Sequence, residues 1–201
     1  MIKKITTLLL LFLLSGCFAN ENNQSNQEQN QSKIASTKTE KSSLFTLKTI
    51  DGKEIHVDET EGGLKFKEFQ DKVIFLVFFG HKCPPCLREI PELIELEKAQ
   101  HEKLAIIAME VQGLEQDQLQ AFAKSKGINY PLMVADQNRP FLDFIIQKAN
   151  WRGSIPFLLG FDRSGTVQVV HIGGITNAQF TKMYKVLSQE SQPQSENNTT
   201  H

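Results

Sequence analysis

The strongest constraint on the fold comes from one apolar run and the residues that follow it. Residues 73–79 read Val-Ile-Phe-Leu-Val-Phe-Phe, and the chain continues through Gly80 to Cys83-Pro84-Pro85-Cys86. A run without polar residues predicts a strand that is buried on both faces of a sheet. Proline is well tolerated at the first position of a helix. The sequence therefore places two thiols, two residues apart, where a buried strand passes into a helix.

These two cysteines form a dithiol that can be oxidised and reduced. The third cysteine, Cys17, lies outside the region that we expect to fold, so the chain offers no other thiol for a bridge. Cys83 precedes the predicted helix, which puts its sulfur at the positive end of the helix dipole, where a thiolate is favoured. We expect Cys83 to be the exposed nucleophile and Cys86 to be the buried thiol that resolves the mixed disulfide.

A structural bridge and a metal site are both disfavoured by the spacing of the cysteine pair. A permanent bridge over two intervening residues would remove little chain entropy, since loop entropy grows with loop length. A zinc site needs four ligands at recognisable spacing, and the histidines at positions 56, 101 and 171 do not supply them. We therefore expect neither a metal nor a cofactor, and we interpret these histidines as surface or sheet residues.

The neighbours of the dithiol bear on its redox poise. Neither Pro84 nor Pro85 has a backbone N–H, so two donors that would stabilise a Cys83 thiolate are absent. This absence predicts a higher thiol pKa and a more reducing couple. His81 and Lys82 act in the opposite direction, because nearby positive charge lowers the pKa of a thiol. We expect a reductant or a near-neutral exchanger.

The rest of the region predicted to fold, residues 44–190, alternates strands and helices. Asp51-Gly52 is a strong signal for a two-residue hairpin at its start. The order of elements is βαβ followed by ββα, which means a mixed sheet with helices on both faces. Strands are predicted over 44–50, 54–57, 73–79, 104–108, 130–134, 157–161 and 166–172, and helices over 84–100, 115–126, 139–149 and 178–187.

Three motifs occur in this region in a fixed order. They are Asp51-Gly52-Lys53, the run Cys83-x-Pro85-Cys86-x-x-Glu89-x-Pro91, and Gly153-Ser154-Ile155-Pro156 before a predicted hairpin. With the order of elements, they resemble the thioredoxin superfamily, and in particular its membrane-tethered, TlpA/ResA-like branch. The resemblance covers residues 44–190 and implies an α/β thioredoxin fold with a central mixed sheet, flanking helices and an added N-terminal β-hairpin. It also implies a thiol–disulfide oxidoreductase.

The resemblance also implies roles for residues around the dithiol. Glu89 would lie beside the active site and help to manage the protons of the cysteines. The alternative is an ordinary solvated glutamate. Val77 occupies the place of thioredoxin's buried aspartate, which leaves Glu89 as the only local candidate. Pro156 would be cis rather than an ordinary trans proline, and Ile155 and Pro156 would contact the substrate. Lys82 departs from the family, which usually has Trp at this position of its docking surface.

The ends of the chain predict export and a lipid anchor. Residues 1–16 begin with Met-Ile-Lys-Lys, continue through an apolar stretch and end in Ser-Gly, as expected of a secretory signal peptide. Cys17 then resembles the lipidated cysteine of bacterial lipoproteins, and the alternative is a plain signal peptide with an incidental cysteine. Residues 17–43 and 191–201 are rich in Asn, Gln and Ser, which predicts disorder. The first of these segments would be a tether.

Three motifs in the polar segments are candidate N-glycosylation sites. Asn23, Asn30 and Asn198 each lie two residues after an acid and two residues before Ser or Thr. The Asn-x-Ser/Thr half is the general acceptor pattern. The acidic extension resembles the acceptor site of the glycosylation system found in some Gram-negative bacteria. Chance matches are expected in segments this rich in Asn.

Together these features predict a lipid-anchored, extracytoplasmic thiol–disulfide oxidoreductase in the bacterial periplasm. A membrane-embedded electron donor would reduce it, and it would reduce disulfides in exported proteins. By resemblance to the branch, these include the haem-binding cysteines of apocytochrome c. A disulfide oxidase or isomerase, and a redox-inactive binding module, are the alternatives. The formal net charge of −1 and the lack of a basic stripe argue against a nucleic-acid partner.

Overall fold

The structure, a computed structural model, describes residues 44–189. The predicted signal peptide, tether and tail, together with Cys17, Asn23, Asn30 and Asn198, lie outside the described residues. Within residues 44–189, no helix is both long enough and apolar enough to cross a bilayer.

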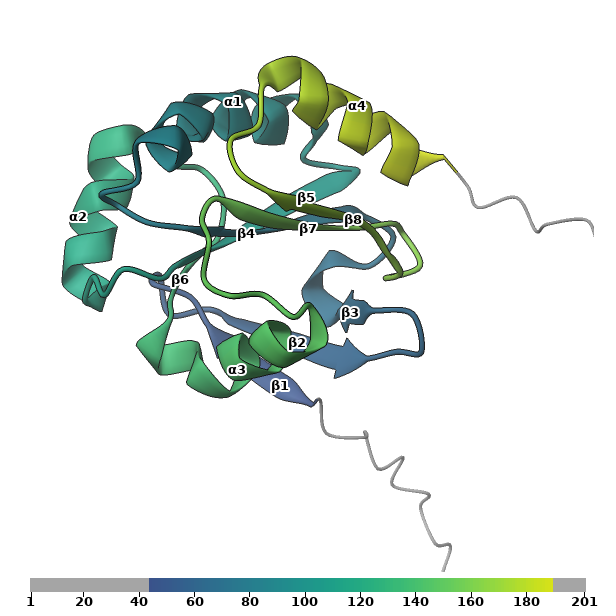
Figure 1. Cartoon of the computed structure of the whole chain (residues 1–201), viewed down its shortest axis with the longest axis horizontal. Coiled ribbons are helices and arrows are strands. Elements are labelled where there is room, and N and C mark those ends of the chain that lie inside the picture. The colour runs from purple at the N-terminus through teal and green to yellow at the C-terminus, as the bar shows by residue number, and fades with distance from the viewer. Residues whose placement is uncertain (1–43, 190–201) are drawn as a thin grey trace, which may run out of the picture. The chain divides into compact units, whose positions relative to one another are not determined.

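A five-stranded mixed sheet forms the centre of the domain (Figure 1). Its strands lie in the order β6-β5-β4-β7-β8, with β4 parallel to β5 and antiparallel to β7. The predicted mixed sheet is thus confirmed. The strands are β4 Val73–Phe79, β5 Leu104–Glu110, β6 Leu132–Val134, β7 Phe157–Phe161 and β8 Val167–Ile172.

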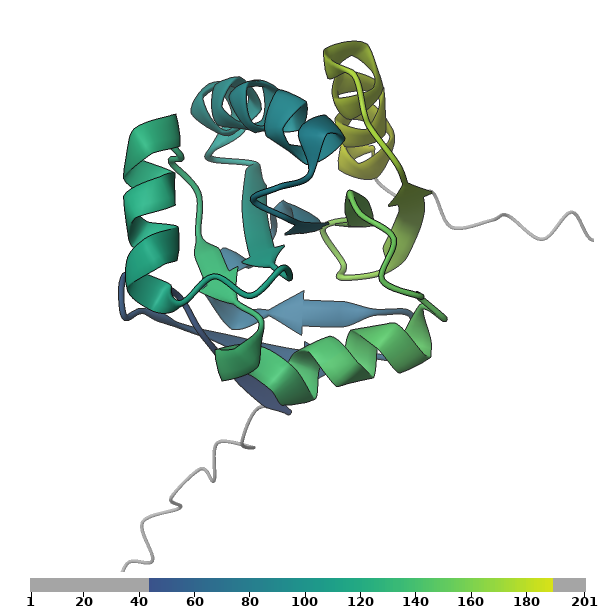
Figure 2. The ribbon, with the colours of Figure 1, turned by 60° about the vertical axis from the view of Figure 1, so that its left-hand side comes forward.

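Helices cover both faces of this sheet. Helices α1 and α4 lie side by side on one face, and α3 lies on the other (Figure 2). The predicted bounds of α1 are confirmed at both ends. The helices are α1 Pro84–Gln100, α2 Gln116–Lys126, α3 Arg139–Lys148 and α4 Asn177–Ser188, with short 3₁₀ helices η1 Lys67–Phe69 and η2 Asp136–Asn138.

The central strand β4 is apolar throughout because it serves two cores. All seven of its side chains are buried. Successive side chains of a strand point to opposite faces, and here one set packs with residues of α1, α2 and α4 while the other packs with α3 and the N-terminal strands. The first set is Val73, Phe75, Val77 and Phe79, and the second is Ile74, Leu76 and Phe78.

The predicted N-terminal hairpin belongs to a separate three-stranded sheet. Strands β1 Phe45–Lys48 and β2 Glu54–Glu59 pair as expected, and β3 Leu64–Phe66 joins the far edge of β2. The buried side chain of Asn138 fastens this sheet to the rest of the domain. Its amide group donates to the carbonyl oxygens of Lys48 and Val134 over 3.0 and 2.9 Å, and its Oδ1 accepts from Lys48 N over 2.8 Å.

The β7–β8 hairpin is closed by the buried carboxylate of Asp162. This side chain accepts hydrogen bonds of 2.6–3.1 Å from four donors, which are Ser164 N, Ser164 Oγ, Thr166 N and Gln168 Nε2. Phe161, next to Asp162, pairs with Ile74 near the start of β4. Cys83 follows the opposite end of β4. The hairpin therefore lies at the end of the sheet away from the dithiol.

Candidate active site

Cys83 and Cys86 form a disulfide at the N-terminus of α1, with Cα atoms 5.3 Å apart. Cys83 is the N-cap residue, and its Sγ accepts a hydrogen bond of 3.3 Å from the backbone N–H of Cys86. The helix therefore places an amide donor and its positive end beside the sulfur of Cys83. This is the geometry that favours a thiolate once the disulfide is opened.

The expectation that Cys83 is exposed is wrong for the oxidised protein. Cys83 is 6% exposed and Cys86 is 2% exposed, so both lie in the core and Cys83 is only the more accessible of the two. The cause is the segment before β7. The carbonyl oxygen of Ile155 lies 3.9 Å from Cys83 Sγ, and Ile155 packs against both cores.

Of the two backbone N–H groups that the prolines remove, only one could have donated a hydrogen bond to Cys83 Sγ. Pro84 and Pro85 occupy the first two helical positions, N1 and N2, and Cys86 is the first residue of α1 with a backbone N–H. An N-cap side chain accepts from the amides at N2 or N3. The amide at N3 is that of Cys86, which already donates to Cys83. The donor that Cys83 lacks is therefore the one at Pro85.

The peptide bond between Ile155 and Pro156 is cis, as the resemblance implied. Neighbouring contacts hold this segment in place. Trp151 stacks on Phe157 with ring centroids 4.9 Å apart, and its Nε1 donates to Ser154 O over 2.8 Å. The carbonyl oxygen of Pro156 accepts from Gly173 N over 2.8 Å. The Ile155–Pro156 segment thus has a fixed position against Cys83.

Glu89 is buried on the inner side of α1, so the alternative of a solvated surface glutamate is wrong. It is 3% exposed, and its Oε1 accepts a hydrogen bond of 2.6 Å from Ile175 N. Burial raises the pKa of Glu89 to about 7, and this effect outweighs the opposing effects of the Ile175 N–H and the charge of Arg88. Glu89 is therefore a carboxyl group that can gain or lose a proton near neutral pH.

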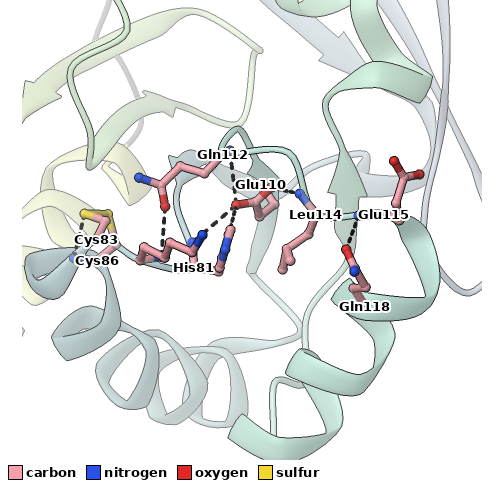
Figure 3. A network of polar contacts seen from close by, with 9 residues as sticks. His81, Cys83, Cys86, Glu110, Gln112, Leu114, Glu115 and Gln118 are labelled. Carbon is pink, nitrogen blue, oxygen red and sulfur yellow. Dashed lines mark hydrogen bonds and ion pairs between the residues drawn. A yellow bond between two sulfur atoms is a disulfide. The ribbon is translucent and has the colours of Figure 1, made fainter.

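A second buried acid, Glu110, lies beside the loop that carries Cys83 (Figure 3). Its Oε1 is 2.8 Å from His81 Nδ1 and accepts from the backbone N–H groups of His81 and Gln112 over 3.2 and 3.1 Å. Its Oε2 accepts from Leu114 N over 3.0 Å. Burial alone would raise the pKa of Glu110, but these hydrogen bonds more than offset it and leave the pKa below its ordinary value.

Two features of this network were not predicted. Glu110 was not expected to be a site residue, because it ends β5 two residues beyond the predicted strand at 104–108. His81 was expected to lend positive charge to Cys83, and its Nδ1 lies 2.8 Å from Glu110 Oε1, so a charge on the ring would be paired with that carboxylate. One sequence feature could have identified Glu110. It is a charged residue at the carboxyl end of a buried strand, and it pairs with Phe79 at the end of β4, just before the dithiol.

Gln112 extends the network to the residue before Cys83. Its side-chain oxygen accepts a hydrogen bond of 2.8 Å from Lys82 N. A Cβ atom at Gly80 would overlap with the Gln112 side chain, so this close approach depends on glycine. The backbone N–H groups of the two residues before Cys83 thus both donate to side chains. That of His81 donates to Glu110, the last residue of β5, and that of Lys82 donates to Gln112, which follows β5.

The histidines at positions 56, 101 and 171 occupy the places that were expected. His56 lies on β2 with Nδ1 2.7 Å from Glu68, His171 lies on β8, and His101 is exposed after α1. In the described part of the chain, no three His, Cys, Asp or Glu side chains are grouped so as to hold a metal ion.

Comparisons with known proteins find thioredoxin-like relatives. Residues 39–170 match the AhpC/TSA family. The thioredoxin-like protein YneN of Bacillus subtilis is 26% identical over 67% of this chain and 71% of its own length. The thiol-disulfide oxidoreductase ResA of Halalkalibacterium halodurans is 27% identical over 73% of this chain and 75% of its own.

Solved structures share the fold. A thioredoxin-family thiol:disulfide interchange protein from Chlorobium tepidum superposes with a TM-score of 0.57 at 26% identity, over 71% of this chain and 92% of that one. The exposed lipoprotein thioredoxin Etrx1 of Streptococcus pneumoniae superposes with a TM-score of 0.53 at 19% identity, over 71% of this chain and 98% of that one. The second likeness concerns the fold alone.

The fold and the disulfide at the start of α1 define a thioredoxin-like thiol–disulfide oxidoreductase. Because the match spans most of the chain, the protein belongs to the AhpC/TSA family.

Proposed function

We propose that this protein is a lipid-anchored, extracytoplasmic reductant of disulfides in exported proteins. The observation that carries the direction of electron flow is the hydrogen bonding of Cys83. Among the first three helical positions, only Cys86 has an N–H to donate to its sulfur. A thiolate with fewer donors is less stabilised, so the dithiol holds its protons more tightly and the disulfide is harder to reduce.

The proposed exchange proceeds in two steps. The Cys83 thiolate attacks one sulfur of a substrate disulfide, which forms a mixed disulfide and releases the other substrate sulfur as a thiolate. The Cys86 thiolate then attacks Cys83 Sγ, which closes the Cys83–Cys86 disulfide and releases the second substrate thiolate. Two electrons pass to the substrate. Glu89 would accept the proton that Cys86 must lose, because its pKa near 7 matches that task.

Substrate contact is assigned to the segment beside Cys83. The Ile155 carbonyl oxygen lies 3.9 Å from Cys83 Sγ, so a chain bound at Ile155 and Pro156 would bring its sulfur to Cys83. A membrane-embedded donor would return electrons to the Cys83–Cys86 disulfide. Apocytochrome c cysteines are the substrate class that the TlpA/ResA resemblance favours.

The proposed location rests on the ends of the chain. Residues 1–16 have the pattern of a signal peptide, and Cys17 follows Leu-Ser-Gly as in bacterial lipoproteins. A pneumococcal protein with the same fold is an exposed lipoprotein. The proposal includes a diacylglyceryl group on Cys17 and glycans on Asn23, Asn30 and Asn198. Intact-mass measurement of the native protein tests both, since an unmodified Cys17 or a single unshifted mass would refute the corresponding part.

The direction of electron flow is tested by the redox potential of the Cys83–Cys86 couple, measured by equilibration with glutathione. We expect a potential more reducing than about −180 mV, the value of protein disulfide isomerase. A potential near ~−120 mV, that of the strong periplasmic oxidants, would instead indicate a disulfide oxidase. The alternative of a redox-inactive binding module is tested by insulin reduction, with Cys83→Ser as the control. A binding module requires negligible rates in both the wild type and Cys83→Ser.

A further inference from the structure

The carboxylate of Glu110 faces three backbone N–H donors and one ring nitrogen. Three backbone N–H groups and the Nδ1 of His81 converge on its two oxygens, and its side chain has no exposed surface. The three backbone N–H groups can only donate, so they favour the ionised form of Glu110. With Glu110 ionised, the ring nitrogen that faces it, Nδ1 of His81, carries a hydrogen. The geometry therefore favours an anion at this position.

Glu110 joins two loops across the ends of neighbouring strands. It is the last residue of β5 and pairs with Phe79, the last residue of β4. Of its donors, His81 belongs to the loop before Cys83, and Gln112 and Leu114 belong to the loop before α2 (Figure 3). The side chain of Gln112 then binds Lys82 N. The loop that delivers Cys83 to the helix is thus attached to the end of β5 at two successive residues.

This attachment involves neither sulfur atom. Its hydrogen bonds do not depend on the disulfide, so they can hold residues 81 and 82 when the disulfide is open. The stability of a disulfide depends on how closely the reduced thiols are held, because a restrained thiol has a higher effective concentration towards its partner. Restraint of the loop before Cys83 therefore bears directly on the redox equilibrium.

We propose that Glu110 is a positioning residue for thiol–disulfide exchange, which together with Gln112 holds Cys83 beside Cys86 in the reduced protein and so stabilises the disulfide. Glu110 touches neither the substrate nor a sulfur, and acts through the backbone of the loop. The inference needs only the oxidoreductase activity and holds for either direction of electron flow.

The test is the equilibrium constant with glutathione of the Glu110→Gln variant. Glutamine has the same shape, but it places an NH₂ group against N–H donors, so the attachment of the loop is weakened. We expect the equilibrium to move about tenfold towards the reduced dithiol, which corresponds to a potential about 30 mV more oxidising. Loss of stability by itself would not move this equilibrium.

Asp162→Asn is the matched control. Asp162 is also a buried carboxylate that accepts from four donors, but it closes the β7–β8 hairpin at the other end of the sheet. Its substitution should lower the denaturation midpoint and leave the equilibrium with glutathione within about twofold of the wild type, because no thiol is repositioned.

A second variant keeps the test decisive if Glu110→Gln does not fold. Gln112 is exposed, so Gln112→Ala removes the acceptor of Lys82 N with little disturbance of the core. We expect a shift in the same direction and smaller than tenfold. An unchanged equilibrium with glutathione in folded Glu110→Gln would overturn the proposal. If Glu110→Gln does not fold, an unchanged equilibrium in Gln112→Ala would overturn it. A shift in Asp162→Asn as large as that in Glu110→Gln would also overturn it. The wild-type potential tests the proposed reductant independently.

Discussion

The backbone N–H of Ile175 donates a hydrogen bond of 2.6 Å to Oε1 of Glu89. This bond joins the helix that carries the dithiol to the segment between β8 and α4. Gly174, the neighbour of Ile175, lies so close that a Cβ there would be 3.5 Å from Cβ of Pro85. The buried acid and the start of α1 are therefore covered by the same short segment, which explains why the charged form of Glu89 is disfavoured.

The first prediction concerns the pH dependence of stability. The pKa of Glu89 is about 7 in the folded protein, whereas the ordinary value for a glutamate is 4.5, so the folded state binds the proton more tightly. The contribution of Glu89 to stability should therefore be fully present below the lower value and should be lost as pH rises through 7, by about 3 kcal/mol in total. Glu89→Gln should lack this fall in urea denaturation of the oxidised protein. The control is Glu95→Gln, which changes an exposed glutamate of the same helix. Parallel curves for the wild type and Glu89→Gln would contradict the prediction.

The second prediction concerns catalysis by the same group. If Glu89 accepts the proton of Cys86, the rate at which Cys86 attacks a Cys83 mixed disulfide and releases a small thiol should show an inflection near pH 7. Glu89→Gln should lose that inflection and react more slowly above pH 7, on the order of 100-fold, which is the lower end of general-base effects. Stopped-flow measurement across neutral pH decides the matter, and superimposable profiles would remove Glu89 from the mechanism.

A third prediction separates the two prolines before Cys86. Pro85→Ala supplies an N–H at the second helical position, where an N-cap side chain can accept it. The pKa of the Cys83 thiol should fall by about one unit, since a hydrogen bond to a charged group contributes about 1.5 kcal/mol. Pro84→Ala supplies an N–H only at the first position and should leave that pKa nearly unchanged. The pH dependence of iodoacetamide alkylation measures both, and equal shifts would show that the position of the donor is irrelevant.

The fourth prediction distinguishes the two cysteines. Cys83 is the more exposed of the two residues, at 6% against 2% for Cys86. Cys86→Ser should therefore accumulate a stable mixed disulfide with an exported substrate, because the second step is blocked. Cys83→Ser should trap none. Non-reducing electrophoresis followed by mass spectrometry shows the adducts and identifies the substrates, and trapping by Cys83→Ser alone would reverse the assigned roles.

The fifth prediction concerns the joint between the two sheets. Asn138→Ala would leave the N–H and carbonyl oxygen of Lys48 and the carbonyl oxygen of Val134 without their side-chain partner. Unsatisfied buried groups cost about 1–3 kcal/mol, so denaturation should be easier by about that amount. Hydrogen exchange should rise most at Lys48. A loss of stability without faster exchange at Lys48 would show that Asn138 does not hold this joint.

Much of the fold could be predicted from the sequence, because its strongest patterns are local. The bounds of α1 follow from the cysteine–proline run at its start and from its apolar stripe, and β4 follows from its unbroken apolar run. Strand β3 was missed because its three residues are too few to show a period. It exists because β2 and the β7–β8 turn lie next to it, as the bond from Leu64 N to Gly165 O shows.

The active site was predicted only in part, for a different physical reason. The dithiol and Pro156 are marked by residue types that few other roles explain. The role of Glu110 depends on partners 29 residues earlier in the chain, and nothing in the sequence pairs it with His81. Burial of Glu89 depends on the segment at Ile175, 86 residues later. Such long-range polar contacts follow from the assembled fold and not from any local pattern.

The contact between Gly80 and Gln112 has a consequence for how this site evolves. Any larger residue at position 80 would displace the Gln112 side chain from Lys82 N. The two positions should accordingly change together among descendants of one ancestor, and glycine should accompany glutamine more often than chance allows. Proteins that have this pair together with His81 and Glu110 would share one inherited way of holding the loop that positions the Cys83 sulfur.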